Sequence, residues 1–313
     1  MVGFSRHDDE STTMRVEQQK GKTMTPDEYC QQKAAQSGSS FYYSFRFLEE
    51  TRRLAITALY AFCREVDDAV DECSDERIAR EKLAWWRMEV AAMFQGNPSH
   101  PVSKALLPHL ENFNLAEEYF LEIIDGMQMD LDFDSYATFK ELSLYCYRAA
   151  SAVGLLSVEI FGYEDRKTLK YAHDLGMAFQ LTNIIRDVHE DALRGRVYLP
   201  QDELKKYNIT NEQLLDNETT EDFKALMQFQ TERARKYYQS ALAYLPESDR
   251  FSQRSGIIMA EIYLQTLNEI ENDGFRVLEH RIKLTPIRKL WIAWTSARRE
   301  KKRFRKADQR KVA

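Results

Sequence analysis

Two acidic segments constrain this chain most. They span residues 60–71 and 180–191, about 110 residues apart, and each lies in a largely apolar stretch with helical spacing. Unpaired carboxylates in such surroundings would cost free energy. Each segment also carries an arginine one turn or less before an aspartate. Carboxylates and arginines on two facing helices suit a diphosphate held through magnesium ions, which predicts chemistry with diphosphate as the leaving group.

In the first segment, Asp67 and Asp71 are four residues apart and share one face of a helix, with Arg64 one turn earlier. Asp68 points about 100° away from that face. An isolated pair of this kind is usually a set of salt-bridged acids on a solvated face. The apolar neighbours and the presence of a second such segment favour a functional site instead.

The second segment places oxygen ligands in a ladder along one helix face, at positions i, i+4 and i+8. Magnesium prefers one or two carboxylates and completes its octahedral shell with substrate phosphate and water. Two such faces across a cavity therefore predict more than one magnesium ion. The ladder, the glutamine that extends it and the flanking arginine are Asn183, Asp187, Asp191, Gln180 and Arg186.

Composition and periodicity favour long helices. Glycine and proline together supply only 18 of 313 residues, so the chain has few turns. No alternation of period two is long enough for a strand, and the fold is predicted to be all-α. Residues 1–24 are expected to be a disordered leader, with Met24 as an alternative start, and 25–285 a single catalytic domain. Helical spacing covers 52–71, 78–94, 115–130, 138–162, 166–191, 219–245 and 251–280.

The tail, residues 286–313, is basic and amphipathic. Residues 281–313 hold 13 Lys/Arg and 2 Asp/Glu, and since the whole chain carries −6, the first 280 residues carry −17. A helix starting at Pro286 would place Ile287, Leu290, Trp291 and Trp294 on one face. Two interpretations remain open: a packed terminal helix with a solvated end, or a peripheral membrane anchor that seeks anionic lipid.

Several classes of function are disfavoured. The acidic body does not suit nucleic acid. The four cysteines form no CxxC pair, which indicates reduced thiols in a cytoplasmic protein, with any membrane contact peripheral at the inner face. No run approaches the roughly 18 uninterrupted apolar residues of a membrane span, the best being 149–158. Dinucleotide, P-loop, zinc-protease and nucleophile-elbow motifs are absent from the sequence.

The chain resembles the squalene/phytoene synthase family. The similarity rests on Ser39–Phe41, Tyr60–Asp71, Tyr145–Gly154 and Gln180–Asp191, which with their spacing cover about 260 residues. Within the family it is most similar to the bacterial presqualene diphosphate synthases of hopanoid biosynthesis, through Ser151–Tyr163 and the Trp-rich basic tail.

The resemblance implies a single-domain class I isoprenoid synthase, a helical bundle around a central apolar cavity. It implies that Tyr145 assists proton loss and that Phe41, Val153 and Gly154 line the cavity, the glycine leaving room for a crowded intermediate. The implied magnesium ligands are Asp67, Asp71, Asn183, Asp187 and Asp191, and the other implied substrate contacts are Ser39, Ser40, Tyr60, Arg64, Asp68, Gln180 and Arg186.

The implied reaction is a prenyl transfer that needs two or three Mg²⁺ ions. Two farnesyl diphosphates would condense head to head to presqualene diphosphate, without NADPH, for handover to a downstream squalene-forming enzyme. Alternatives are a squalene, dehydrosqualene or phytoene synthase on the same fold, and a non-catalytic assembly protein, which would have eroded aspartates. A terpene cyclase is disfavoured by N-x-x-R-D-x-x-x-D at 183–191. Product, prenyl chain length and oligomeric state stay open.

Overall fold

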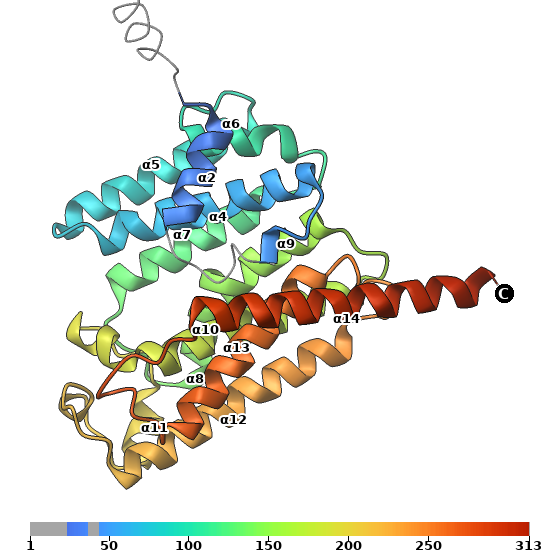
Figure 1. The fold of residues 1–313 in the computed structure, drawn as a ribbon. Helices are drawn as coiled ribbons and strands as arrows, with labels where there is room; N and C mark the ends of the chain where they lie inside the picture. Colours follow the sequence, from blue (N-terminus) through green and yellow to red (C-terminus); the bar gives the residue numbers. More distant parts are fainter. Residues whose placement is uncertain (1–23, 37–43, 313) are drawn as a thin grey trace, which may run out of the picture.

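The computed structural model describes residues 24–36 and 44–312, and Figure 1 shows how the helices are arranged. Apart from Met24, the predicted leader lies outside the described residues. The first helix begins at Pro26, directly after Thr25. Thr25 Oγ1 accepts from the Glu28 amide at 3.2 Å, and Glu28 Oε2 accepts from the Thr25 amide at 2.8 Å, which is a reciprocal capping box.

The prediction of an all-α fold is confirmed, since the described residues contain no strand beyond one isolated bridge between Ser135 and Val197. A π-helical turn, Tyr147–Ser151, joins α8 to α9. The α-helices are α2 (Pro26–Gln36), α4 (Glu50–Asp71), α5 (Glu76–Phe94), α6 (Pro101–Leu106), α7 (Glu117–Asp132), α8 (Phe139–Cys146), α9 (Ala152–Phe161), α10 (Lys167–Leu193), α11 (Gln201–Lys206), α12 (Glu221–Tyr244), α13 (Arg254–Asn272) and α14 (Pro286–Val312).

Helix boundaries differ from the prediction in two ways. The sequence patterns missed the six-residue helices α6 and α11. They also predicted that the helix before the tail extends to residue 280, whereas α13 ends at Asn272. The physical reason is a left-handed turn, because Gly274 has φ 74° and Phe275 has φ 60°, and neither value continues a right-handed helix.

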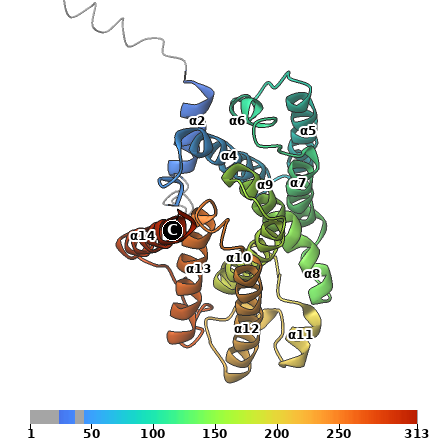
Figure 2. The ribbon, with the colours of Figure 1, turned by 90° about the vertical axis from the view of Figure 1, so that its right-hand side faces the viewer.

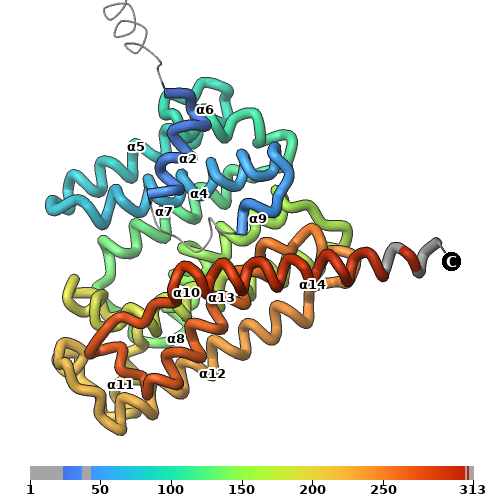
Figure 3. Tube along the Cα trace, in the orientation of Figure 1, coloured from blue at the N-terminus to red at the C-terminus, as the bar shows by residue number. Residues whose placement is uncertain are grey.

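Two apolar clusters form the core. One is built mainly from α4, α5, α7 and one side of α9, and the other from α10, α12, α13 and the opposite side of α9. Leu156 and Ile160 of α9 belong to the first cluster, while Leu155 and Val158 belong to the second. Turning the molecule shows α9 and α10 between the α4–α5–α7 group and the α12–α13 group (Figure 2). The Cα trace follows the same two groups (Figure 3).

The segment Phe139–Phe161 is long and apolar enough to cross a membrane by length and composition, and half of its apolar window is buried inside the structure. Core helices of soluble proteins meet the same criterion. Here the segment packs closely on α10: a Cβ added to Gly176 would lie 2.5 Å from Ser151 Cα and 2.7 Å from Ser151 N. Only glycine allows the two backbones to approach this closely.

Candidate active site

The two acidic segments meet across one polar pocket. α4 contributes Asp67 and Asp71, and α10 contributes Asn183, Asp187 and Asp191, so the ladders predicted from helical spacing line the same space. Tyr60, Arg64, Tyr145, Gln180 and Arg186 line it as well. The residues of each ladder line one pocket because α4 and α10 are long and unbroken through both segments, so residues four apart stay on one face.

Arginines pair with the aspartates on both walls. Arg64 Nη1 lies 2.5 Å from Asp67 Oδ2, and Arg186 Nη2 lies 2.5 Å from Asp187 Oδ2. Burial disfavours the charged form of Arg186, but its ion pair with Asp187 outweighs this and raises the pKa of the guanidinium. The pocket therefore holds cations suited to diphosphate oxygens, each held in place by a carboxylate.

Sequence patterns missed three further arginines in the same pocket. Arg194 and Arg196 follow α10 and reach Asp71, with Nη1 of Arg196 2.8 Å from Oδ1 and Nη1 of Arg194 3.2 Å from Oδ2. Arg281 reaches Asp187, with 2.9 Å between Nε and Oδ1. The Arg-Gly-Arg run at 194–196, shortly after the second acidic segment, was a usable signal, whereas nothing local marks Arg281.

Carboxylates are crowded in this pocket. Burial raises the pKa of Asp67 to about 6, with Arg64 opposing the shift and Asp71 adding to it. Burial also raises the pKa of Asp191 to about 7, and the charge of Asp187 adds to that rise. Both shifts mean that negative charge is held here at a cost, which a bound cation would relieve.

The donor set fits magnesium. Asn183 Oδ1 is buried without a hydrogen-bond partner, although Asn183 lines the pocket on the same helix as Asp187 and Asp191. Within the described residues, no three His, Cys, Asp or Glu side chains converge closely enough to hold an ion alone. Magnesium takes one or two carboxylates and completes its shell with other oxygen ligands, so the carboxylates of the two walls and the Asn183 amide oxygen are donors that fit it.

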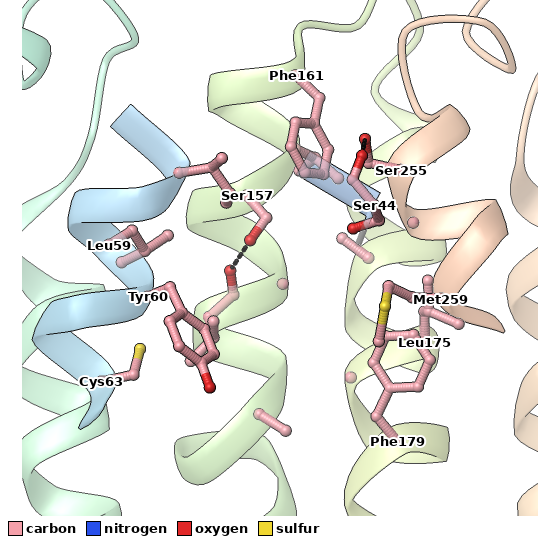
Figure 4. A pocket seen from close by; sticks show the side chains of 18 of the residues that line it. Ser44, Leu59, Tyr60, Cys63, Ser157, Phe161, Leu175, Phe179, Ser255 and Met259 are labelled. Carbon is pink, nitrogen blue, oxygen red and sulfur yellow. Dashed lines mark hydrogen bonds between the residues drawn. The ribbon is translucent and has the colours of Figure 1, made fainter. Parts of the chain in front are cut away.

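An apolar cavity adjoins the polar pocket. The two share five lining residues, so the polar pocket passes directly into apolar walls. Figure 4 shows Leu59 of α4 facing Leu175 of α10 and Met259 of α13 across the cavity, with Phe161 at the end away from Tyr60. This is the central cavity that the resemblance implies. The shared residues are Tyr60, Cys63, Ala149, Gln180 and Asn183.

Val153 and Gly154 line the cavity, and Gly154 also packs closely on α10. A Cβ added to Gly154 would lie 2.8 Å from the carbonyl oxygen of Ala172 on α10. The absent side chain therefore leaves room for the backbone of α10, and its implied role toward a crowded intermediate stays a prediction.

Tyr145 sits in a buried polar cluster at the edge of the pocket. Its hydroxyl lies 3.3 Å from Asp130 Oδ2, and the Tyr198 hydroxyl donates to Asp130 Oδ1 at 2.7 Å. The two tyrosine rings stack with centroids 4.9 Å apart. Burial raises the pKa of Tyr145 well above its usual value, so it acts as a neutral hydroxyl. Asp130 also lines the polar pocket, and burial raises its pKa to about 7.

Other predicted residues lie elsewhere. Asp68 turns out of the pocket, held by Lys33 Nζ at 2.8 Å and Arg64 Nη2 at 2.6 Å, because it points away from the Asp67 face. Ser39, Ser40 and Phe41 lie outside the described residues.

The comparisons with known proteins agree on one family. The model of the squalene/phytoene synthase family matches residues 34–288. Phytoene synthase of Arthrospira platensis is 37% identical over 270 residues, covering 81% of this chain and 86% of that protein. The 15-cis-phytoene synthase of Synechocystis sp. is 34% identical, covering 86% and 85%. A crystal structure of a dehydrosqualene synthase superposes with TM-score 0.79 and 27% identity, covering 88% and 97%.

Proposed function

We propose, from the premise that this chain belongs to the squalene/phytoene synthase family, that it condenses two geranylgeranyl diphosphates head to head to form phytoene. As a member it is a prenyltransferase. The sequence resemblance favoured farnesyl diphosphate and presqualene diphosphate instead. Phytoene comes first here because the similar relatives that cover most of the chain carry that activity in their names.

One observation carries the proposal: a pocket of paired aspartates and arginines opens directly onto an apolar cavity. A prenyl diphosphate has the same division, with a charged head and a long hydrocarbon tail. Tyr60, Gln180 and Asn183 mark the boundary, since they line both spaces. The head of the substrate would lie among the ladders, and its tail would run along Leu175 and the other apolar side chains.

The polar residues would stabilise the leaving group. Asp67, Asp71, Asn183, Asp187 and Asp191 would hold Mg²⁺, on which the family generally depends. Bound magnesium would offset the charge that develops on the departing diphosphate. Arg64, Arg186, Arg194, Arg196 and Arg281 would donate hydrogen bonds to phosphate oxygens, exchanging part of their present pairing with carboxylates for substrate.

The apolar walls would protect the cation left behind. After C–O cleavage, C1 of the first substrate bonds to the C2–C3 double bond of the second, and loss of a proton closes a cyclopropyl diphosphate. Loss of the second diphosphate, rearrangement and loss of another proton then give phytoene. Leu59, Leu175 and Met259 exclude water from these steps, and the Phe179 ring offers a π-face to positive charge.

Tyr145 would help to remove a proton as a neutral hydroxyl paired with Asp130. Its own phenolate is disfavoured by burial, so the acceptor of the proton must lie beyond it, at Asp130 or the released diphosphate. Tyr198 would hold the Asp130 carboxylate in position for this transfer.

A second candidate is the same coupling of farnesyl diphosphate, to presqualene diphosphate or dehydrosqualene. The superposition on a dehydrosqualene synthase favours it. A non-catalytic assembly role is disfavoured because all four ladder aspartates are present and line one pocket.

Product analysis separates these candidates. Purified protein would be incubated with Mg²⁺ and either geranylgeranyl or farnesyl diphosphate, with and without NADPH. We expect phytoene from the longer substrate without NADPH. Coupling of farnesyl diphosphate alone would replace the first candidate by the second, and no coupled product from either substrate would refute both.

A further inference from the structure

The outward face of α14 is a surface that the coupling reaction does not use. α14 packs on α13 through one face, where Ala293, Ser296 and Glu300 are 1%, 0% and 2% exposed. It crosses in front of α13 and extends past the rest of the fold at its carboxyl end (Figure 1). Seen end-on, it lies at the edge of the molecule (Figure 2).

Ion pairs fix α14 along most of its length. Arg288 Nη2 lies 2.7 Å from Glu269 Oε1, Arg250 Nη2 lies 3.0 Å from Glu300 Oε1, and Arg303 Nη2 lies 2.6 Å from Glu247 Oε2. The helix is therefore held with a defined face outward, and of the two interpretations of the tail, a packed helix is correct for its inner face.

The outer face begins with an apolar patch. Ile287, Leu290, Trp291 and Trp294 are 80%, 45%, 63% and 47% exposed and follow one another at spacings of one turn or less. The two indole rings lie 5.4 Å apart between centroids. We call these four residues the tryptophan patch. Such large side chains are rarely left in water together unless another surface covers them.

A row of cations continues the same face. Arg298, Lys301, Lys302 and Arg305 are exposed and follow Trp294 at helical spacing, and the Arg298 guanidinium lies 5.3 Å from the Trp294 ring centroid. We call these four residues the cationic row. We propose that the tryptophan patch and the cationic row dock this protein on the surface of an anionic lipid bilayer.

Charge and composition select this occupant. A bilayer interface takes tryptophan and aliphatic side chains at headgroup depth, and anionic headgroups attract the adjacent cations. The chain offers both on one straight, anchored helix, which is the arrangement of an in-plane amphipathic helix.

The position of the tryptophan patch and the cationic row on the fold agrees with the proposed function, but the docking proposal does not rest on that function. Phe304 of α14 stacks on Phe251 with centroids 4.4 Å apart. Four residues further along the chain, Ser255 lines the apolar cavity and lies near Phe161, at the end away from Tyr60 (Figure 4). A bilayer on α14 would therefore lie beside the hydrocarbon end of the cavity.

Vesicle binding tests the proposal. The full chain would be sedimented with vesicles of phosphatidylcholine alone or mixed equally with phosphatidylglycerol. We expect binding to the anionic vesicles, weakened at about 0.5 M salt. The double variant Trp291→Ser/Trp294→Ser and the triple variant Lys301→Glu/Lys302→Glu/Arg305→Glu should each bind about tenfold or more weakly.

Matched controls sit on α5. Met88 is 64% exposed, and Lys82 is exposed on the same helix, so Met88→Ser and Lys82→Glu should bind as the unaltered protein does. Indole fluorescence of the unaltered protein should also be quenched by brominated lipid, a readout that needs no variant to fold. Absence of binding and quenching would overturn the proposal. Unchanged vesicle binding by both variants would also overturn the proposal. The same holds if vesicle binding is unchanged in both variants and the only effect of the double variant is to dissociate a dimer.

Discussion

Arg196 lies with its Nη1 atom 2.8 Å from Oδ1 of Asp71, so the loop after α10 holds the last carboxylate of α4. The two residues are 125 positions apart, and both line the polar pocket. The same guanidinium would have to serve diphosphate once substrate binds. We therefore place Arg196 in the binding machinery on equal terms with Arg64 and Arg186.

Replacing Arg196 tests that role. Arg196→Gln should lower kcat/KM for the prenyl diphosphate by about 10²–10³-fold, as expected when a preorganised donor to a developing anion is lost. Steady-state kinetics would measure it, with Arg276→Gln as the control, since Arg276 pairs with Asp273 on the surface. Equal kcat/KM for Arg196→Gln and the control would contradict the assignment.

The metal site predicts a stability effect that needs no turnover. Mg²⁺ with inorganic diphosphate should raise the melting temperature by about 5 °C at saturating ligand. Asp71→Asn and Asp187→Asn should lose most of that rise, as should addition of EDTA, while the exposed Asp216→Asn should keep it. Differential scanning calorimetry would check this. A full rise in both ladder variants would mean that the ion binds elsewhere.

Local spacing was enough to predict the ladders but not what surrounds them. Asn183, Asp187 and Asp191 share a face because α10 runs unbroken from Lys167 to Leu193. Arg281 reaches Asp187 across 94 positions, a contact fixed by the turn that ends α13. The close approach of Gly154 to Ala172 could not be predicted for a similar reason, because it is set by the packing of α9 on α10.

Close backbone packing predicts graded costs for added methyl groups. In Gly176→Ala the new Cβ would meet Ser151 Cα at 2.5 Å, whereas in Gly126→Ala its nearest neighbours lie at 3.1 Å. Gly176→Ala should lower the free energy of unfolding by about 2–3 kcal/mol or more, and Gly126→Ala by clearly less. Urea denaturation would compare them. Equal effects, or a larger one for Gly126→Ala, would contradict the packing described for α10.

Asp130 predicts a dependence of stability on pH. Its folded pKa of about 7 exceeds the value of about 3.9 expected in the unfolded chain, since burial disfavours the anion. Its contribution to stability is therefore full below about pH 4 and is lost as the pH rises through about 7.

Asp130→Asn removes that titration, so it should gain stability relative to the unaltered protein between pH 5 and 7.5, by about 5 °C in melting temperature. Melting curves of both proteins across this range would measure the difference. Asp132→Asn, at the end of the same helix, serves as the control. A difference that stays constant with pH would rule out the titration of Asp130 as its cause.

The most direct test of the central claim is coupling itself. An equal mixture of unlabelled and fully deuterated geranylgeranyl diphosphate would be incubated with Mg²⁺ and the protein, and the hydrocarbon products weighed by mass spectrometry. If the site joins two prenyl diphosphates, phytoene of mixed mass should be as abundant as both unmixed forms together, and Asp71→Asn should abolish all three. The same assay would be run in parallel with farnesyl diphosphate. If both assays gave only products with one prenyl unit, that result would contradict head-to-head coupling.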